Sequence, residues 1–481
     1  MARGVGREAE SAGRCGADAG AVGESEGERR FFVGAGDGGG GAGGVAVGVW
    51  LEGRGARVGV WRVAAVSGRA VRRAVCGAVY PGGGFGPHRR GGRMERDQLK
   101  ALVRATGVAV EQNGVLLLGE ATVLKKWEET WQAQRPTLSA EDSELGWLAI
   151  ATGGSSGVAK FARHDERTVS AAVEGFCQHF EIERVNAIDV LPAYHVSGLM
   201  ARVRCAATGG MHVAWNWKRI EAGERPALAV GGGDWVISLV PTQLQRLLAS
   251  EGAVAWLRGF RAIFVGGGPV WPELAAAAER AGLPVALTYG MTETAAMVAA
   301  LKPAEFLAGE RSSGAALPHA KISLGPGGVV RIGGESVFRG YWPERVETRE
   351  LETDDVGCLD ERGRLRILGR RDAVIITGGK KVHPADVELA LRATGEFDDV
   401  VVIGVPDAEW GEAVVACYPA EGRQPDLRRV TEGVGNLAGS LRPKRYVKVT
   451  QWPTNDLGKV NRAAVMAAAA AVIAGPRRAS L

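Results

Sequence analysis

Residues 151–160 read ATGGSSGVAK and combine residue types that bind phosphate. Glycines let backbone N–H groups turn inward, while hydroxyls and an ammonium group add hydrogen-bond donors and positive charge. The spacing differs from G-x-x-x-x-G-K-[ST], because Lys160 follows Gly157 by three residues and Phe161 comes next. A flexible surface turn is the alternative for an isolated stretch of this composition. The donors predict an anion site built from Thr152, Gly154, Ser155, Ser156, Gly157 and Lys160.

Three more polar loops follow strand-like segments. They are residues 192–198 (PAYHVSG), 266–269 (GGGP) and 289–294 (YGMTET). Ligands of open α/β sheets bind beyond the carboxyl ends of the strands, so such loops converge on one edge. Each loop alone is also explained as a turn, and a single histidine in a loop is usually packed or solvated. Only their combination points to a site.

The elements that would position these loops alternate between strand and helix from Met94 onward, which favours an α/β fold with much parallel sheet. We expect strands at residues 114–119, 187–191, 235–240, 262–265 and 285–288, and helices at 95–106, 242–250 and 271–281. Short, turn-rich strands follow at 329–332 and 365–368. After Asp372 a smaller unit contains a strand at 400–403 and a terminal helix from Val465.

Composition narrows the class of protein. With 46% hydrophobic and 23% charged residues, the 481-residue chain is typical of a globular protein of two or three domains. No run approaches the ~18 apolar residues of a membrane span. The six cysteines lack C-x-x-C spacing, which indicates neither a zinc site nor a disulfide framework. We therefore expect a cytoplasmic protein.

Residues 1–93 differ sharply from the remainder. They hold 14 arginines, no lysine, 8 acidic residues and 27 of the 71 glycines, and they show no sustained helical or strand period. We interpret them as a disordered arm or, preferably, as GC-rich DNA translated in a wrong frame. The rest of the chain carries 45 basic and 46 acidic residues. This near-neutral balance gives no electrostatic argument for a nucleic-acid partner.

In this order, the loops resemble the adenylate-forming superfamily of acyl-CoA synthetases, luciferases and adenylation domains, from about residue 145 to residue 463. Residues 152–160 resemble the family's phosphate loop T-S-G-T-T-G-x-P-K, with glycine for the first serine and alanine for proline. The resemblance implies a large domain over residues 94–371. One hypothesis is that the N-terminal part of this domain is incomplete compared with other family members. The resemblance also implies a small, mobile α+β domain over residues 372–481. The implied ligands are ATP, Mg²⁺ and CoA.

The resemblance also assigns roles on the nucleotide side. Tyr289 would stack on adenine in a slot lined by Gly268 and Pro269. Thr292 would contact the α-phosphate and Glu293 would bind Mg²⁺. Residues 353–355 (TDD) stand where the family has T-G-D, so Asp355 would accept both ribose hydroxyls. Arg370 would contact ribose or phosphate, and Asp372 would be the hinge between the domains.

Two further motifs belong to the smaller unit. Lys459, in the segment TNDLGKVNR, would stabilise the negative charge that develops during adenylation. Gly378 and Gly379 would line the tunnel for the pantetheine of CoA after the small domain rotates. The family joins a carboxylic acid to CoA in two steps, through an acyl-adenylate.

Residues 191–199, 238–248 and 289–297 are similar to the branch of the family that activates o-succinylbenzoate in menaquinone and phylloquinone synthesis. This acid has two carboxylates, and the one that is not activated needs a partner when it leaves water. Thr242 and Arg246 lie four residues apart on an expected helix, so Arg246 is the candidate partner, unless it extends into solvent. His195 would orient the reacting carboxylate, and Ser197 would donate a hydrogen bond.

Other hypotheses stay open. The acid could be another aryl or short-chain acid, or the chain could be an inactive, truncated homologue. The expected partner is thus a small carboxylic acid, with no nucleic acid and no membrane span. A homodimer is an alternative on which the sequence is silent.

Overall fold

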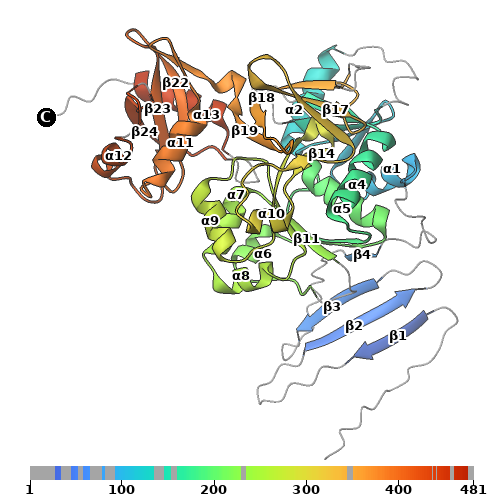
Figure 1. Ribbon diagram of the computed structural model, residues 1–481. Coiled ribbons are helices and arrows are strands. Elements are labelled where there is room, and N and C mark those ends of the chain that lie inside the picture. Colours follow the sequence, from blue (N-terminus) through green and yellow to red (C-terminus); the bar gives the residue numbers. More distant parts are fainter. Residues whose placement is uncertain are drawn as a thin grey trace, which may run out of the picture. The chain divides into compact units, whose positions relative to one another are not determined.

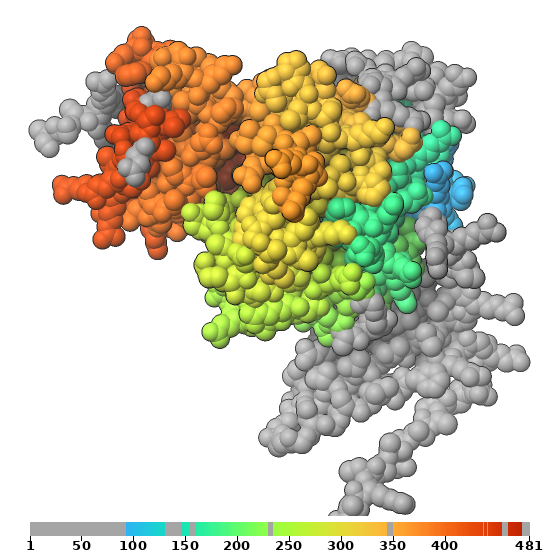
Figure 2. Space-filling view, in the orientation of Figure 1, coloured from blue at the N-terminus to red at the C-terminus, as the bar shows by residue number. Residues whose placement is uncertain are grey.

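A computed structural model describes residues 93–129, 146–152, 160–228, 234–343, 350–435, 437–439, 441–454 and 460–473, and also the backbone of some flanking helix ends and of strands before residue 82. Figure 2 shows the described residues in colour. The chain divides into two compact units, Met1–Gly84 and Phe85–Leu481, which are considered separately.

The first unit contains an antiparallel sheet in the order β1-β2-β3. Its strands are β1 (Glu28–Val33), β2 (Val45–Glu52) and β3 (Val58–Ala64), and a short strand, β4, covers Val79–Pro81. The strands β2 and β3 are rich in valine, a residue that favours extended backbone. The interpretation of residues 1–93 as a disordered or mistranslated arm stays a prediction.

The second unit is organised around a sheet in which β15, β14, β13, β12, β11, β9 and β10 follow one another. The strands from β10 to β13 are parallel, and β14 and β15 are antiparallel additions at one edge. Their bounds are Val185–Asp189 (β9), Met211–Ala214 (β10), Asp234–Leu239 (β11), Ala262–Val265 (β12), Val285–Met291 (β13), Ala296–Ala300 (β14) and Ala315–Ala316 (β15). The predicted α/β class is confirmed.

Helices cover both faces of this sheet (Figure 1). Alternate strand residues point to opposite faces. Ile237 and Ile263 therefore join the apolar core under α7 (Pro241–Leu248), α8 (Glu251–Leu257) and α9 (Pro272–Arg280). Their neighbours Val236 and Phe264 pack on the other face against α4 (Glu166–Phe180) and α5 (Val196–Thr208). Shorter helices are α6 (Trp217–Glu221) and α10 (Pro303–Leu307).

A second sheet has the order β5-β6-β7-β8. Its strands are β5 (Ala109–Gln112), β6 (Val115–Leu118), β7 (Leu148–Thr152) and β8 (Lys160–His164). Leu99 and Val103 of α1 (Arg96–Arg104) pack against one face, and α2 (Ala121–Gln134) places Leu124 against the other. All four residues of β6 are buried, as expected for a strand covered on both sides.

Two antiparallel-rich sheets complete the unit. The first, β16-β17-β18-β19, consists of β16 (Ala320–Leu324), β17 (Val329–Gly334), β18 (Glu350–Leu359) and β19 (Leu365–Arg370). The second, β21-β20-β23-β22 with β24 beside β23, consists of β20 (Ile375–Thr377), β21 (Lys380–Val382), β22 (Val401–Asp407), β23 (Gly411–Pro419) and β24 (Arg445–Val449). Its helices are α11 (Pro384–Ala393), α12 (Leu427–Gly433) and α13 (Arg462–Ala474). The expected domain boundary falls in the turn η3 (Arg371–Ala373), between the two sheets.

Within the part of the chain that the structure describes, no helix has the length and hydrophobicity needed to cross a membrane. The described cysteines, Cys177, Cys205, Cys358 and Cys417, are free thiols.

Candidate functional site

The two ends of the predicted phosphate loop are fixed by strand pairing. Thr152 ends β7 and Lys160 begins β8, and these two residues face each other across the antiparallel pair. The predicted loop residues Gly154, Ser155, Ser156 and Gly157 lie outside the described residues. Lys160 is exposed at the start of its strand, so its side chain is available at the mouth of this hairpin.

A segment far along the sequence runs beside β8. The amide of Arg163 donates to the carbonyl of Gly340 (2.9 Å), the amide of Arg339 to the carbonyl of Arg163 (2.8 Å) and the amide of Trp342 to the carbonyl of Phe161 (2.8 Å). This pairing acts as an extra strand on β8. It brings the ring of Tyr341 beside Lys160, whose Nζ lies 5.1 Å from the ring centroid.

The predicted loop at residues 289–294, called here the signature turn, is held by a buried histidine. Nε2 of His164 lies 2.7 Å from the carbonyl oxygen of Thr292, which begins the turn η1 (Thr292–Thr294). Burial lowers the pKa of His164 to about 4, although the Thr292 carbonyl and Asp165 act in the opposite direction. The imidazole is therefore neutral near pH 7. Its Nε2 carries the hydrogen, because a carbonyl oxygen can only accept.

Glu293 in the same turn is held by hydrogen bonds from the segment 338–342. Its carbonyl accepts from the amide of Phe338 (2.8 Å), and its Oε1 accepts from the hydroxyl of Tyr341 (2.8 Å). Burial, followed by the charge of Glu293, raises the pKa of Tyr341, so this phenol stays a neutral donor. Lys160, Thr292, Glu293 and Tyr341 thus form one cluster from three separated stretches of sequence, called here the phosphate-side cluster.

The donor set of this cluster fits magnesium. The described residues contain no group of three His, Cys, Asp or Glu side chains that could cage a metal ion. Mg²⁺ bound with a nucleotide usually takes one or two protein carboxylates and obtains its other ligands from phosphate oxygens and water. Glu293 offers one hard carboxylate oxygen in a turn, which suits that arrangement.

The predicted adenine and ribose residues also come together. The register of β18 and β19 places Asp355 opposite Arg370, with 3.7 Å between Oδ1 and Nη1. The hydroxyl of Tyr289 donates to Oδ2 of Asp355 at 2.7 Å, and the amide of Asp355 donates to the hydroxyl of Thr353. Burial and the neighbouring carboxylate raise the pKa of Tyr289, which keeps it a donor. Tyr289, Asp355 and Arg370 are called the ribose-side cluster.

Ion pairs surround Arg370. Its guanidinium donates to both carboxylate oxygens of Asp372 (2.8 and 2.7 Å), the predicted hinge, and to Asp354 (3.3 Å). Asp354, the acid that replaces the family's glycine, also accepts from Arg371 at 3.2 Å. The hydrogen bonds to Asp372 are the main cause of the raised pKa of Arg370. These side chains are partly exposed, so each pair contributes little stability by itself.

The predicted adenine slot follows β12. Gly267 adopts φ +76°, and a Cβ on Gly266 would meet the Thr288 hydroxyl at 2.3 Å, so this turn requires glycine for space and for conformation. Gly268 lies against Pro241 at the start of α7, and Pro269 is exposed.

The predicted acid-binding residues are placed less favourably. His195 occupies the N-cap position of α5 without a capping hydrogen bond from its side chain, and its ring lies 4.8 Å from that of Tyr194. Ser197 lies in the first turn of the same helix. Thr242 is half-buried on α7. The Arg246 side chain is 61% exposed and pairs with Glu221 at 2.6 Å. For Arg246 to bind a substrate carboxylate, this ion pair has to open first.

Of the two motifs predicted in the region after Asp372, the structure describes the glycine pair but not the lysine. Gly378 and Gly379, with φ +54° and +74°, form the two-residue turn between β20 and β21, a conformation that favours glycine at both positions. Lys459 lies outside the described residues. The chain on both sides of it is tied down, because Thr454 bridges to Val460 and Arg462 forms a two-pronged ion pair with the buried Glu388 (2.5 and 2.6 Å).

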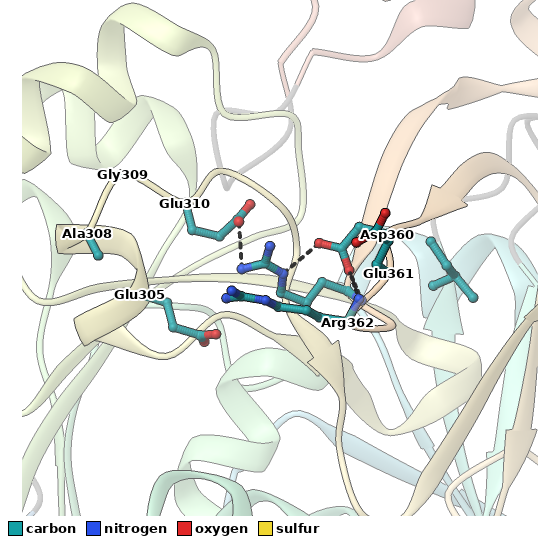
Figure 3. A pocket seen from close by; sticks show the side chains of 9 residues that line it. Glu305, Ala308, Gly309, Glu310, Asp360, Glu361 and Arg362 are labelled. Carbon is teal, nitrogen blue, oxygen red and sulfur yellow. Dashed lines mark hydrogen bonds and ion pairs between the residues drawn. The ribbon is translucent and has the colours of Figure 1, made fainter.

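A surface cavity of about 750 Å³ lies apart from these clusters and contains none of the predicted site residues. Glu310 and Asp360, both labelled in Figure 3, form ion pairs with the guanidinium of Arg364 (2.6 and 2.7 Å). Charges that neutralise each other in this way leave little to attract a ligand. Its volume alone gives no reason to assign chemistry to this cavity.

Four residues of the site were not predicted from the sequence. They are Tyr341, His164 and the buried ion pair of Asp165 and Arg339 (2.8 Å), and they tie the loops together. The only available signal was the run FRGYW at residues 338–342, which combines aromatic rings with a glycine. Nothing in the spacing shows that it pairs with a strand some 180 residues earlier.

Comparison with known proteins decides the family. Residues 64–342, more than half of the chain, match the family described as "AMP-binding enzyme". The chain belongs to this family. The match begins within residues 1–93, ahead of Met94, where we expected meaningful sequence to start.

This AMP-binding family member is 30% identical over 288 residues to a 2-succinylbenzoate–CoA ligase from Listeria monocytogenes serotype 4b, which covers 58% of this chain and 61% of the relative. It is 31% identical over 302 residues to an indoleacetate–CoA ligase from Aromatoleum aromaticum, covering 57% and 58%. The chain thus spans about three fifths of the length of these curated relatives.

Among solved structures, the family member is similar to o-succinylbenzoate coenzyme A synthetase from Bacillus subtilis in complex with ATP and magnesium ion. The identity is 25%, the TM-score is 0.56, and the match covers 67% of this chain and 70% of that chain.

Proposed function

We propose that the chain is an ATP-dependent acid–CoA ligase that works through an acyl-adenylate. The observation that carries the proposal is the placement of the two clusters. Tyr289 of the ribose-side cluster and Glu293 of the phosphate-side cluster are the ends of five consecutive residues. One short segment therefore connects groups suited to a nucleoside with groups suited to phosphate and magnesium, as ATP requires.

In the first step, a carboxylate oxygen of the acid attacks the α-phosphorus of ATP, and pyrophosphate leaves. Asp355 would hold the ribose hydroxyls, and Thr292 would donate a hydrogen bond to the α-phosphate. Lys160 would attract the outer phosphates. Magnesium held by Glu293 would neutralise charge on the phosphate oxygens. Lys459 would offset the negative charge that grows between acid and phosphate.

In the second step, the thiol of CoA attacks the carbonyl carbon of the acyl-adenylate. A thioester forms, AMP leaves, and the thiol proton is released. We propose that rotation about Asp372 withdraws Lys459 and brings the turn at Gly378 and Gly379 to the pantetheine. The glycine turn suits this role, because a Cβ built on Gly379 would have open space around it, with no heavy atom of the described residues within 4 Å.

For the acid, we propose o-succinylbenzoate, as in menaquinone synthesis. The Listeria protein is named a 2-succinylbenzoate–CoA ligase, and the Bacillus protein is named an o-succinylbenzoate coenzyme A synthetase. Three stretches of this sequence resemble that branch of the family. His195 and Ser197 at the start of α5, with Thr242 and Arg246 on α7, would form the acid site. A cytoplasmic location follows from this role.

A second candidate is a ligase for an aryl acid with one carboxylate. The observation that favours it is the ion pair between Arg246 and Glu221, because Arg246 is then already occupied and not available to a spare substrate carboxylate. The similarity to the indoleacetate–CoA ligase agrees with this reading.

Release of pyrophosphate tests the proposal and separates the two candidate functions. The protein is incubated with ATP, Mg²⁺ and one acid at a time: o-succinylbenzoate, benzoate or indoleacetate. The proposal predicts release that depends on o-succinylbenzoate and falls more with this acid than with benzoate in Arg246→Ala. Equal losses with both acids would remove the proposed role of Arg246.

A further inference from the structure

Tyr341 contacts two side chains of opposite charge. Its hydroxyl donates to Oε1 of Glu293 at 2.8 Å, and the ammonium of Lys160 lies over its ring, 5.1 Å from the centroid. A lysine over an aromatic face is attracted by the electron density of the ring. Donation of the phenol hydrogen to a carboxylate increases that density, so the two contacts reinforce each other.

The backbone fixes Tyr341 in this position. Its neighbours Gly340 and Trp342 hydrogen-bond to β8 on either side of it, and Tyr341 itself forms a bridge with Ala162. Phe338 packs edge-on against the ring at 4.9 Å between centroids, and its amide holds the carbonyl of Glu293. The ring therefore cannot move without disturbing either β8 or the signature turn.

The contacts of Glu293 leave one oxygen for a ligand. Oε1 accepts from Tyr341, and among the described residues no hydrogen bond is made to Oε2. Groups that hold a metal-binding carboxylate in place commonly affect metal affinity by 10- to 100-fold.

We propose that Tyr341 is a positioning residue that presents Oε2 of Glu293 to nucleotide-bound magnesium and prevents Lys160 from forming an ion pair with Glu293. The inference rests on the proposed function for the identity of the ligand. In this arrangement the lysine stays available for phosphate and the carboxylate for the metal. Direct pairing of the two side chains would neutralise both.

Two substitutions separate the two contacts. Tyr341→Phe keeps the aromatic face for Lys160 and removes only the hydrogen bond to Glu293. Tyr341→Leu removes both and opens the path between the two charges. Tyr418→Phe, a tyrosine packed near Phe397 in the C-terminal sheet, is the matched control.

The first readout is the free Mg²⁺ concentration that gives half-maximal pyrophosphate release at saturating ATP and acid. We expect it to rise about tenfold in Tyr341→Phe and further in Tyr341→Leu, and not to change in Tyr418→Phe. A higher KM for ATP is expected only in the leucine variant, because there Lys160 is drawn to Glu293.

The second readout needs no acid and no turnover. It is the rise in the melting temperature of the full chain on adding ATP with Mg²⁺, minus the rise on adding ATP with EDTA. The difference should shrink in both Tyr341 variants. Adding Lys160→Met to Tyr341→Leu should recover part of it, since the competing cation is removed.

The outcomes are distinct. A Tyr341→Phe protein with wild-type magnesium dependence in both readouts overturns the inference, even if the ligase reaction is observed. Equal loss of ATP binding with and without Mg²⁺ also overturns it, because that result indicates a structural role only. If no acid yields pyrophosphate but the melting-temperature pattern appears, the proposed function fails while the role of Tyr341 stands.

Discussion

At the scale of single residues, the site depends on side chains that are held in place by specific hydrogen bonds. Asp355 faces Arg370 across two strands and already accepts from Tyr289. His164 is buried with one ring nitrogen on the Thr292 carbonyl. Each of these groups leads to a measurable consequence.

Replacing Asp355 with Ala should remove the discrimination between ribose and deoxyribose. A hydrogen bond to a charged group contributes about 1.5–3 kcal/mol, so KM for ATP should rise roughly 10- to 100-fold. KM for 2′-deoxy-ATP should rise less, so the KM values for the two nucleotides should become similar. Pyrophosphate release with each nucleotide measures this. Asp354→Gly is the control, and a similar loss of discrimination in that variant would argue against the assignment to Asp355.

Replacing His164 with Gln should flatten the pH dependence of stability. The folded pKa of about 4 lies below the ordinary 6.5, so between these values the unfolded chain binds more protons, and stability falls as the pH decreases. The contribution of this buried group is about 3 kcal/mol between pH 6.5 and 4. Urea unfolding at pH 4.5 to 8 measures it. An unchanged slope in the variant would show that His164 is not the group responsible.

At the scale of elements, the site depends on the pairing of the segment 338–342 with β8. The guanidinium of Arg339 donates to Asp165 at 2.8 Å, and both side chains are largely buried. Burial alone would raise the pKa of Asp165, but the hydrogen bonds from Arg339 and the Thr168 amide outweigh it and keep the pKa below the usual value. Asp165 also caps α4 through the amides of Arg167 and Thr168.

Replacing only one partner of this ion pair should lower the free energy of unfolding more than replacing both. Arg339→Leu leaves a buried, unpaired carboxylate, so we expect a loss of about 3–5 kcal/mol in the free energy of unfolding. The double variant Asp165→Asn/Arg339→Leu should recover most of this loss, because asparagine still caps α4. Urea unfolding at pH 7 measures both. Additive losses would contradict the account.

The sequence predicts individual elements well and their long-range pairing poorly. The strand expected at 262–265 is β12 without change, and the helix expected at 242–250 is α7 within two residues at either end. Local patterns of apolar residues determine these elements. The placement of Tyr341 beside Lys160 depends on backbone pairing between distant segments, which has no local signal.

The position of a helical side chain relative to a pocket is equally hard to predict. Spacing places Thr242 and Arg246 on one face of α7, but a charged residue elsewhere decides what Arg246 contacts. Glu221 on α6 is that residue. The motif YGMTET, by contrast, consists of adjacent residues, which form the end of β13 and the turn η1.

At the scale of the whole molecule, the proposed reaction needs Lys459, a residue of the C-terminal region after Asp372. The chain beside Lys459 is held by the Arg462–Glu388 ion pair and by the bridge between Thr454 and Val460. The ion pair joins α13 to α11, two helices of the sheet formed by β20 to β24, and the isolated bridge lies between β24 and α13 in the sequence. The account therefore requires that this region delivers an ammonium group to a nucleotide bound by residues of the other sheets.

The most direct test is acid-dependent exchange of labelled pyrophosphate into ATP, measured on the wild-type chain, Lys459→Ala and the control Lys448→Ala, an exposed lysine of β24. Exchange reports formation of the acyl-adenylate without CoA. The account predicts exchange with o-succinylbenzoate in wild type and Lys448→Ala, and a loss of roughly 10²- to 10³-fold in Lys459→Ala. Wild-type exchange in Lys459→Ala, or no exchange with any acid by a wild-type chain that binds ATP, would contradict it.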